Sequence, residues 1–589
     1  MSAMQLLLTE HIDIWTAADS EKKSGRGRAS GNAGSVYGVK KLRELILELA
    51  VRGKLVPQDL NDEPASELLK RIQAEKSKLV AEGKIKKEKP LESISEDEKF
   101  FELPSRWEWV RVGSLGNWGA GATPLRSVSS YYGGTMPWFK SGELIADFID
   151  TAEETVTDLA LKDCSLRLNQ PGDVLLAMYG ATIGKASILK IAGTTNQAVC
   201  ACTPNGSIFN RYLLLMLKAM KSNFVGQGAG GAQPNISREK IIATLTALPP
   251  LAEQHRIVAK VDELMALCDQ LEQQHSNAQE AHETLVSQLL ATLTQSQNAV
   301  EFNTNWQRIY AHFDVLFTTE ASIEALKQTL LQLAVMGKLV PQDANDEPAS
   351  ELLKRIQAEK AKLIAEGKLK KEKPLAPISE DEKPFELSMG WEWARFEALL
   401  TNASVGLDRG KSQQNHDLKY AYFKMNNIKN EGGYDYTNLV RVNACSEELE
   451  RFKLVDGDFL FNTRNSRELV GKTCVIRDLP EKDIIYNNNI LRVQFLNLME
   501  PEFIDNWFRS ESGSQNLDNL KSNTTNVCAI YQGNLFNYLC PVAPKAEQHR
   551  LVAKVDALMA ICDQLKTRIQ QANQQQQAIA NALVAQAIA

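Results

Sequence analysis

Residues 53–76 read GKLVPQDLNDEPASELLKRIQAEK, and residues 337–360 repeat this segment with one substitution, Ala344 for Leu60. The other 23 of the 24 aligned positions are identical. An internal repeat of this kind has to be interpreted before any local pattern, because it decides the architecture of the whole chain. The sequence therefore predicts two similar structural frames.

A second repeat follows later in each half of the chain. Residues 252–271 read AEQHRIVAKVDELMALCDQL, and residues 546–565 read AEQHRLVAKVDALMAICDQL, at an offset of 294 residues. The first repeat extends more loosely over 42–109 and 326–393 at an offset of 284 residues. The stretches enclosed by the repeats therefore differ in length, and they also differ greatly in sequence. Two similar frames that hold different inserts are the main indication of function.

The composition is that of a soluble, globular protein. At 589 residues the chain is too long for one hydrophobic core and indicates three or four domain-sized units. The start, MSAMQLLLTEHIDIW, has no basic region before its short apolar run, and no run of 18 apolar residues predicts a membrane span. The nine cysteines are scattered, and the one close pair, Cys200 and Cys202, lacks a zinc spacing. We therefore expect a reduced, cytoplasmic protein without a membrane association.

The net charge of −6 argues mildly against nucleic-acid binding. It is a whole-chain average, however, and a phosphate backbone needs only a local basic surface. Residues 19–38 are rich in Gly, Ser, Lys and Arg, so residues 1–38 are interpreted as a flexible N-terminal segment. Its basic cluster is either a DNA contact or an inert solvated tail, and the sequence favours the tail.

The frames are predicted to be helical, with frame 1 at 39–109 and a connector plus frame 2 at 298–393. Apolar residues at helical spacing precede Gly53, a natural helix end. They are Leu42, Leu45, Ile46 and Leu49. A second helix is expected to start after Pro64 with Ser66 as its N-cap and to end at Gly83, before the charged linker 84–90.

Polar, surface-type residues of the repeat are identical in both copies. In the first copy they are Gln58, Asp59, Asn61, Asp62 and Glu63. One interpretation is recent duplication, and the other is that the same partner docks on both copies. We favour docking, because folding needs only the apolar pattern and the enclosed inserts did diverge.

The first insert, 110–250, is interpreted as an α/β domain with long polar loops. PGDVLLAMY and GKASILKI are strand-like runs bounded by turn signals, and RYLLLMLKAM is typical of a helix. The second insert, 394–545, interleaves basic and aromatic residues in VGLDRGKSQQNHDLKYAYFKMNNIKN, a pattern suited to a nucleic-acid surface. Its segment DGDFLFNTRNSRELVGKTCVI places Arg and Asn in a loop, where either could read a base edge or merely form an ordinary polar loop.

Two long helices are predicted at 251–297 and 546–589. Both carry apolar residues in alternating steps of four and three, the seam of a coiled coil. In the first helix the seam is Ile257, Val261, Leu264, Cys268, Leu271, His275, Ala278, His282, Leu285 and Leu289, and in the second it is Leu551, Val555, Leu558, Cys562, Leu565, Ile569, Ala572, Ile579 and Leu583. The two seam histidines are either ligands or polar residues that set the register, and we favour the latter. The helices are expected to pack antiparallel, because a long domain returns the chain between them.

The motifs of common catalytic sites are absent from the sequence. YGATIGKAS and SRELVGKTC resemble a phosphate loop but lack its first Gly, and no dinucleotide fingerprint, H-E-x-x-H, paired Cys-x-x-Cys or nucleophile elbow occurs. The Asn/Asp-Pro-Pro-aromatic tetrapeptide of amino-methyltransferases is also missing. These absences oppose a self-sufficient methyltransferase and predict a non-enzymatic chain.

A family resemblance rests on an ordered set of motifs in the first insert. They are T-P-x(6)-Y-Y-G-G-x-x-P-W (123–138), G-D-V-L-L (172–176), G-A-T-I-G-K (180–185), T-N-Q-A-V (195–199), Q-P-N-I-S (233–237) and L-P-P-L-A-E-Q (248–254). Together they resemble the specificity subunit of type I restriction–modification enzymes, and the repeated frame resembles the type IB subgroup. The second insert lacks the Thr-Pro and Pro-Trp elements but keeps G-D-F-L-F (457–461), G-K-T (471–473) and N-N-N-I-L-R (487–492).

This resemblance implies a mixed α+β fold. Two α/β target recognition domains, at 110–250 and 394–545, would be separated by two long antiparallel coiled-coil helices, with a pseudo-two-fold internal repeat. Each domain would read one half of a bipartite asymmetric site in double-stranded DNA. Two modification subunits would bind the frames and methylate adenine at N6 with S-adenosylmethionine. Two restriction subunits would add ATP- and Mg²⁺-dependent cleavage of unmodified DNA, and this chain would bind no cofactor itself.

Candidate DNA-binding residues are polar or basic side chains in the loops of the inserts. In the first insert they are Arg126, Lys140, Tyr179, Lys185, Asn196 and Gln197; in the second they are Arg409, Lys411, Lys424, Arg464, Asn465 and Arg467. No catalytic or metal-binding residue is predicted. The alternative function is a coiled-coil scaffold or adaptor without a DNA role, which would show no sequence-selective DNA binding.

Overall fold

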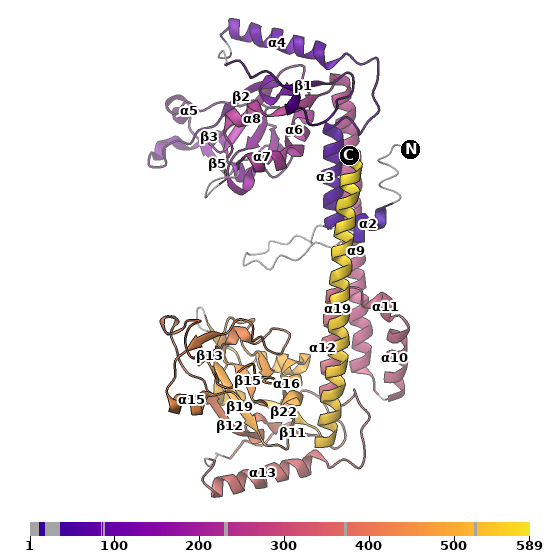
Figure 1. The fold of residues 1–589 in the computed structure, drawn as a ribbon, viewed down its shortest axis with the longest axis vertical. Helices are drawn as coiled ribbons and strands as arrows, with labels where there is room; N and C mark the ends of the chain where they lie inside the picture. Colours follow the sequence, from indigo (N-terminus) through magenta and orange to yellow (C-terminus); the bar gives the residue numbers. More distant parts are fainter. Residues whose placement is uncertain are drawn as a thin grey trace. The chain divides into compact units, whose positions relative to one another are not determined.

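A computed structural model describes residues 11–17, 36–83, 85, 89–228, 234–297, 299–369, 374–523 and 527–588. It divides into unit 1, residues 1–278 with 572–589, and unit 2, residues 279–571 (Figure 1). Most of the predicted flexible segment 1–38 and of the linker 84–90 lies outside the described residues. Within that segment Ile12–Ala17 form helix α2, in which Trp15 is buried, so this part is not a flexible tail.

The frame of unit 1 contains helices α3 (Tyr37–Val51) and α4 (Ala65–Ala81). The predicted apolar face of α3 is confirmed, since Leu42, Leu45, Ile46 and Leu49 are buried. The predicted N-cap of α4 is wrong. Extended Pro64 precedes the helix and Ser66 lies inside its first turn, because the ring of Pro64 fixes the φ angle at the turn and places Ala65 as the first helical residue. Gly83, with φ +68°, follows the helix as predicted.

The frame of unit 2 repeats this arrangement. Helix α12 (Glu320–Val335) corresponds to α3, and α13 (Ala349–Ala365) corresponds to α4, again after an extended proline, Pro348. The connector before it forms α10 (Ala299–Ala311) and α11 (Phe313–Leu316). The two segments related by the offset of 284 residues therefore have the same structure.

The two long helices, α9 (Leu251–Gln295) and α19 (Lys545–Ile588), contribute to both units. In unit 1, the start of α9 packs with α3 and with the end of α19, burying residues such as Val261, Leu264 and Ala580. In unit 2, the end of α9 packs with α12 and with the start of α19 around Leu290 and Cys562. Each unit thus holds a three-helix cluster, and the predicted antiparallel pairing is confirmed.

The predicted continuous seam is wrong in the second half of each long helix. Leu285 and Ile579 are 49% and 47% exposed, whereas the next residues, Val286 and Ala580, are buried. A straight α-helix drifts by about 20° per heptad against a strict 3.5-residue repeat. Because each half of a long helix packs on a different frame helix, the buried face is free to move by one residue between them.

The first recognition domain contains two sheets. One has the order β2 (Gly116–Ala120), β9 (Val199–Pro204), β6 (Val174–Ala177), β7 (Ala186–Leu189), β4 (Phe148–Ile149), and the other has the order β5 (Glu154–Val156), β3 (Tyr132–Phe139), β8 (Thr194–Thr195). Strands β6 and β7 and helix α6 (Asn210–Ala219) confirm the predicted elements. The β6 strand is buried on both faces, which explains its continuous apolar run.

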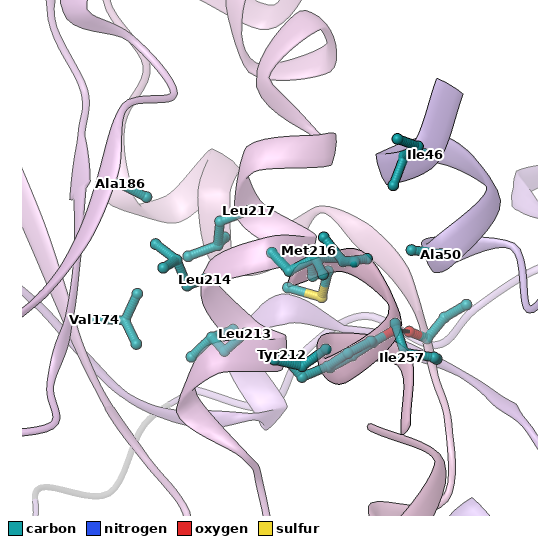
Figure 2. Close-up of a cluster of buried hydrophobic side chains, with 14 of the residues drawn as sticks. Ile46, Ala50, Val174, Ala186, Tyr212, Leu213, Leu214, Met216, Leu217 and Ile257 are labelled. Atoms are coloured by element: carbon teal, nitrogen blue, oxygen red, sulfur yellow. Dashed lines mark hydrogen bonds between the residues drawn. The ribbon is translucent and has the colours of Figure 1, made fainter. Parts of the chain in front are cut away.

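Helix α6 connects this domain to the frame. Figure 2 shows Leu214 and Leu217 facing Val174 and Ala186 of the sheet, while Met216 and Tyr212 face the side of α3 and α9. The helix is therefore apolar on nearly all sides, with six consecutive buried residues from Tyr212 to Leu217. The domain and the frame of unit 1 share one hydrophobic core.

The second recognition domain repeats the order of both sheets and adds a third sheet, β16 (Arg464–Asn465), β21 (Cys528–Ala529), β20 (Ser522–Asn523). The prediction that Arg464 and Asn465 lie in a loop is therefore wrong, because pairing with a distant segment makes them a short strand. The larger sheet of this domain has the order β12 (Leu400–Val405), β19 (Ile490–Phe495), β15 (Phe459–Asn462), β17 (Thr473–Val475), and its smaller sheet has the order β14 (Val440–Val442), β13 (Tyr420–Phe423), β18 (Ile484–Tyr486). These orders match those of the first domain apart from the edge strand β4. Helix α16 (Pro501–Arg509) packs against α12 as α6 packs against α3.

Entry and exit strands close each domain at its base. Strand β1 (Glu108–Arg111) pairs antiparallel with β10 (Leu245–Leu248), and β11 (Glu392–Arg395) pairs in the same way with β22 (Leu539–Val542). The exit strands lead directly into the long helices, so each domain is inserted between a frame and a long helix.

The repeated Ala-Glu-Gln-His-Arg motif ties each domain to its long helix. Buried Glu253 accepts hydrogen bonds from Trp107 Nε1 at 2.9 Å and from Gln58 Nε2 at 2.7 Å. Gln254 accepts a bond from the backbone N–H of Phe209, just before α6, at 3.0 Å. Burial raises the pKa of the Glu253 carboxyl.

The second copy has the same cluster with one bond fewer. Glu547 accepts from Trp391 Nε1 at 3.0 Å, and Gln548 accepts from the Glu500 N–H at 3.0 Å. Oε1 of Glu547 lacks a hydrogen-bond partner among the described residues, and burial raises the pKa of this carboxyl too.

These contacts explain why the polar residues of the repeat are the same in both copies. The repeated polar residues are not free to drift, because several hold the frame together. Asp62 pairs with Arg256 at 2.6 Å, Glu63 pairs with Arg71 at 2.5 Å, and Gln58 bonds Glu253. Their identity in the two copies therefore has an intramolecular reason and is not by itself a sign of docking.

Candidate nucleic-acid interface

Three loops and the start of β9 meet at one edge of the first domain. The Gly121 N–H donates to Val199 O at 3.0 Å, and the Met178 N–H donates to Ala198 O at 2.8 Å. The Ile236 N–H then donates to Met178 O at 2.9 Å. We call this surface, formed by residues 121–124, 178–180, 195–198 and 234–237, the loop edge of the first domain.

The second domain repeats these bonds residue by residue. The Gly406 N–H donates to Ile490 O at 3.1 Å, and the Thr463 N–H donates to Asn489 O at 2.8 Å. The Ile530 N–H donates to Thr463 O at 3.0 Å. The corresponding loop edge is therefore formed by residues 406–409, 463–465, 486–489 and 528–531, with GLDR in the place of GATP.

An asparagine holds the same corner of both loop edges. The backbone N–H groups of Asn196 and Asn487 donate to Phe139 O and Phe423 O, each at 3.0 Å. Their side-chain oxygens accept from the N–H two residues later, at 3.2 Å and 2.8 Å. Asn196 was a candidate for DNA contact, but its amide oxygen shapes the loop. Asn487 plays this part in the second domain and was not among the candidates.

A glycine allows the close approach of two chain segments at each edge. A Cβ at Gly121 would lie 2.2 Å from Thr195 O, and one at Gly406 would lie 2.3 Å from Tyr486 O. Such distances are far below van der Waals contact, and both neighbouring atoms are backbone. These glycines therefore fix the spacing of the loops.

Two candidates of the first domain lie exposed on the loop edge. Tyr179 is 41% exposed, and Gln197 is exposed on the neighbouring segment. Both line a cavity of about 380 Å³ together with Ser237 and Arg238. The sequence candidates Tyr179, after β6, and Gln197, before β9, are thus brought together from separate segments of the chain.

Arg126 and Lys140 of the first domain are occupied by an acidic pair. Arg126 Nη1 lies 2.5 Å from Glu154 Oε2, and Lys140 Nζ lies 2.8 Å from Glu153 and 3.0 Å from Glu154. The Arg126 guanidinium, followed by Lys140, lowers the pKa of Glu154 to about 2. The guanidinium also lies 4.6 Å from the Tyr132 ring centroid. These two cations support the local fold and are largely neutralised there.

Lys185 lies at a different surface of the first domain. It lines a cavity of about 900 Å³ with Lys40 of α3 and Lys221. It is therefore not part of the loop edge with Tyr179 and Gln197.

In the second domain, Arg464 occupies the position that Tyr179 has in the first. Its side chain is exposed, and it follows Thr463 as Tyr179 follows Met178. Asn465 accepts a hydrogen bond from the Ser466 N–H at 2.9 Å, and Arg467 lies 3.4 Å from Asp518. The Arg467 guanidinium is paired with Asp518, whereas that of Arg464 is exposed. Arg464 is therefore the better placed of the two arginines to bind a ligand.

The other candidates of the second domain differ in their accessibility. Arg409 forms two bonds to the Glu448 carboxylate, at 2.7 Å and 2.9 Å, which lowers the pKa of Glu448. Lys424, which follows Phe423 as Lys140 follows Phe139, donates to Gln414 Oε1 at 3.0 Å. Lys411 is exposed in the loop that follows Arg409. The side chains of Arg409 and Lys424 therefore stabilise the loops through intramolecular bonds.

Within the described ranges, no group of three or more His, Cys, Asp or Glu side chains is placed to hold a metal ion. His282 instead bonds Leu316 O at 3.0 Å. In that same part of the chain, no helix is long and apolar enough to cross a membrane.

Comparison with known proteins identifies relatives of this chain. Residues 104–280 match the Methylase_S family, described as "Type I restriction modification DNA specificity domain". The chain is 40% identical to the type I restriction enzyme EcoEI specificity subunit of Escherichia coli over 99% of both chains. It is 41% identical to the EcoAI specificity subunit of Escherichia coli over 100% of both. A chain from a structural study of complex assembly in the type I R-M system aligns with a TM-score of 0.46 and 16% identity, covering 83% of this chain and 99% of that one.

The chain belongs to the type I restriction enzyme specificity subunits. Its role is DNA recognition, so the alternative of a scaffold without a DNA role is wrong. The type IB assignment and the prediction of a specificity subunit, in place of a self-sufficient enzyme, are confirmed by these relatives. The predicted mixed fold, with two α/β domains and long antiparallel helices, is confirmed as well.

Two polar residues of the second loop edge of this specificity subunit were not among the predicted candidates. Asp408 corresponds to Thr123, and Asn488 corresponds to Gln197, by the matched backbone bonds. A signal was present, because the asparagine run 487–489 follows a buried strand as T-N-Q does in the first domain. The absent Thr-Pro and Pro-Trp elements obscured the correspondence.

Proposed function

We propose that this specificity subunit reads a bipartite, asymmetric site in double-stranded DNA, with one loop edge for each half-site. The observation that carries the proposal is that the two edges have the same backbone bonds but present different exposed side chains. An equal scaffold positions each reading group in the same way, and unlike groups select unlike bases. Two identical edges would instead suit a symmetric target.

The matched positions suggest which residues read bases. Arg464 stands where the first domain has Tyr179, and Asn488 stands where it has Gln197. Arginine can bond both O6 and N7 of a guanine, and Asn or Gln can bond N6 and N7 of an adenine in the major groove. We assign these four residues to base contacts, and Lys411 and Lys185 to the phosphate backbone, where a point charge is sufficient. Arg126, Lys140, Arg409, Lys424 and Asn196 act by shaping the loops.

The proposed complex contains partner subunits that perform the reactions. Two modification subunits bind the specificity subunit and methylate adenine at N6 with S-adenosylmethionine, and two restriction subunits add ATP- and Mg²⁺-dependent cleavage of unmodified DNA. The specificity subunit binds none of these cofactors. The duplicated frame supports two equivalent binding places, since α3 with α4 and α12 with α13 repeat one arrangement.

An exchange of the first insert tests the assignment of half-sites. Residues 110–250 are replaced by the corresponding insert of a relative, and the sequence context of methylated adenine is determined in cells carrying the complex. We expect one half of the recognised sequence to change and the other half to remain. An unchanged target, or a change in both halves, would contradict the proposal.

A further inference from the structure

Both units have a cavity where the recognition domain meets the frame helix. In unit 1 a cavity of about 900 Å³ lies between α3, the turn 184–186 and the segment 218–225 at the end of α6. In unit 2 a cavity of about 450 Å³ lies between α12, the turn 470–473 and the segment 508–517 at the end of α16. The same three elements of the repeat therefore form both cavities.

The turns that line the two cavities have the same backbone bonds. The Ala177 N–H donates to Lys185 O at 2.8 Å, and the Asn462 N–H donates to Lys472 O at 2.9 Å. Each turn contains a Gly-Lys pair, and each glycine has a positive φ angle. The two cavities are therefore equivalent surfaces, and their side chains can be compared position by position.

The first cavity has an excess of positive charge. Four lysines and two glutamates line it, namely Lys40, Lys185, Lys218 and Lys221 with Glu44 and Glu48. Lys218 pairs with Asp147, Glu44 pairs with Lys41 at 2.8 Å, and Glu48 pairs with Arg52 at 2.7 Å. Within the described ranges, Lys40, Lys185 and Lys221 have no carboxylate partner. Three positive charges are therefore left uncompensated at this cavity.

The second cavity has no such excess. Four cations and four glutamates line it, namely Lys429, Lys472, Arg509 and Lys521 with Glu324, Glu431, Glu468 and Glu511. Glu324 of α12 stands where α3 has Lys40, at the offset of 284 residues. Lys472, which corresponds to Lys185, donates to Ile428 O at 2.5 Å, and burial lowers the pKa of its ammonium group. The equivalent surfaces therefore differ in charge.

Close packing brings two of the three lysines in unit 1 together. A Cβ at Gly184 would lie 2.7 Å from Lys221 Cγ and 3.1 Å from its Cα, so the turn packs directly on the first residue of α7 (Lys221–Gly228). Lys185 follows in the same turn, and Lys40 and Lys221 are exposed. Like charges that share a surface repel one another, and an anionic ligand would relieve this repulsion.

The lysines lie just across one turn from the loop edge of the first domain. Tyr179 is two residues beyond Ala177, whose N–H bonds Lys185 O, which is about 7 Å along an extended chain. This distance is less than the width of a major groove, about 12 Å. A duplex whose bases meet Tyr179 therefore has phosphates within reach of Lys185. Lysine suits such contacts, because a phosphate needs only a point charge.

We propose that Lys40, Lys185 and Lys221 form a phosphate-binding surface that holds the DNA backbone beside the first loop edge, and that the equivalent cavity of unit 2 does not bind DNA in this way. The inference rests on the proposed function, which assigns Lys185 to the backbone. It adds Lys40 of the frame helix and Lys221 of α7, and it makes the two half-sites unequal in their electrostatic contribution to binding.

The test measures how the affinity of the assembled complex for DNA depends on salt. The complex carries the specificity subunit with Lys40→Gln, Lys185→Gln and Lys221→Gln together, and the duplex carries the sequence found methylated in cells. Each lost phosphate contact lowers the slope of log affinity against log salt by about 0.9, so we expect a slope smaller by about 2.7. Duplexes with single base changes should be weakened by the same factor as the matched duplex, because phosphate contacts carry no sequence information.

A control variant has the same change in net charge. Lys70→Gln, Lys99→Gln and Lys190→Gln remove three lysines of unit 1 that pair with Glu67, Glu96 and Asp150. We expect the control to keep the slope of the unaltered complex. An unchanged slope in the first variant, or an equal change in both variants, would overturn the inference. Absence of sequence-selective binding by the unaltered complex would instead contradict the proposed function.

A second measurement needs no variant. Lysines of the unaltered complex are acetylated with and without the duplex, and the modified residues are identified by mass spectrometry. Lys40, Lys185 and Lys221 should become protected when DNA binds, while Lys429 in the second cavity should keep its reactivity. Equal reactivity of the three lysines with and without DNA would overturn the inference. Full protection before DNA is added would also overturn it, because a protein subunit would then cover the surface.

Discussion

The two loop edges show one pattern of likeness, and helices α4 and α13 of the two frames show the opposite pattern. At the loop edges the backbone bonds are matched while the exposed side chains differ, with Tyr179 opposite Arg464. On α4 and α13 every exposed position but one, Ser77 against Ala361, carries the same residue type, while other parts of the repeat have changed. A surface that meets unlike ligands has to vary, and a surface that meets the same ligand twice has to stay constant. The loop edges therefore differ in the way that the proposed reading of two unlike half-sites requires.

Glycine substitution at the loop edges should give the largest effect on this comparison. An alanine Cβ at Gly121 or Gly406 would lie within 2.3 Å of a backbone oxygen, which neither strand can avoid without separating. We expect each variant to lose about 3 kcal/mol of stability and selectivity for its own half-site only. Gly142→Ala is the control, because no atom lies within 4 Å of its Cβ position. Thermal unfolding and the methylated sequence context provide the measurements, and equal loss in both half-sites would contradict independent edges.

Removal of the Arg464 side chain should have the next largest effect. If Arg464 bonds a guanine through two atoms, Arg464→Ala loses about 1–3 kcal/mol of discrimination at one base pair of the second half-site. Arg467→Ala is the matched control, because Arg467 is already paired with Asp518. Affinities of the assembled complex for duplexes substituted at single positions measure the change. A uniform loss over all duplexes would instead assign Arg464 to a phosphate.

The ion pairs at the bases of the two frames should have equal, smaller effects. Arg256 with Asp62 and Arg550 with Asp346 have the same distance of 2.6 Å, and both arginines are more than one-third exposed. Because solvent screens them partly, Arg256→Ala and Arg550→Ala should each cost about 1–2 kcal/mol, less than a fully buried pair would. Urea unfolding of each variant tests this. A difference above about 1 kcal/mol between the two would show that the frames are not energetically equivalent.

The pH dependence of the buried glutamates should give the smallest effect and distinguish the two frames. Burial raises the pKa of Glu253 and Glu547, so their contribution to stability is fully present below the unfolded value near 4.3 and decreases as pH rises through the folded pKa. Glu253→Gln and Glu547→Gln remove this decrease. Relative to the unaltered chain, each variant should therefore gain stability as the pH rises above the unfolded value near 4.3.

The gain should be larger for Glu547→Gln, because only one carboxylate oxygen of Glu547 has a hydrogen-bond partner in the described part of the chain. Both carboxylate oxygens of Glu253 accept hydrogen bonds from N–H groups. A glutamine has only one side-chain oxygen, so Glu253→Gln would lose one of these bonds. Unfolding midpoints across this pH range measure the difference. A gain in stability confined to Glu253→Gln would contradict the expectation that the carboxylate with fewer hydrogen bonds, Glu547, is the more destabilising one at high pH.

Local patterns predicted much of the architecture. The repeats gave two frames, helical spacing placed the α3 face at Leu42, Leu45, Ile46 and Leu49, and turn signals bounded the strands β6 and β7. These features depend on residues close together in the chain. Their backbone preferences and apolar periodicity can be recognised without knowing which other elements pack against them. The second halves of the long helices were misplaced by one residue for the opposite reason. Which face of Leu285 or Ile579 is buried depends on α12 or α3, far away in the sequence.

By itself, the sequence determined that this specificity subunit repeats a frame, encloses two unlike domains and carries long paired helices. Only the tertiary structure decided which side chains of those domains share an edge. Asn487 and Arg464 of the second domain correspond to Asn196 and Tyr179 of the first. In each domain, strand pairing joins segments that are far apart in the chain, so no fixed sequence spacing predicts that they share an edge. The structure also decided that Arg126 and Arg409 are held by carboxylates. A basic residue in a polar loop looks the same in a sequence whether its charge faces DNA or is already neutralised.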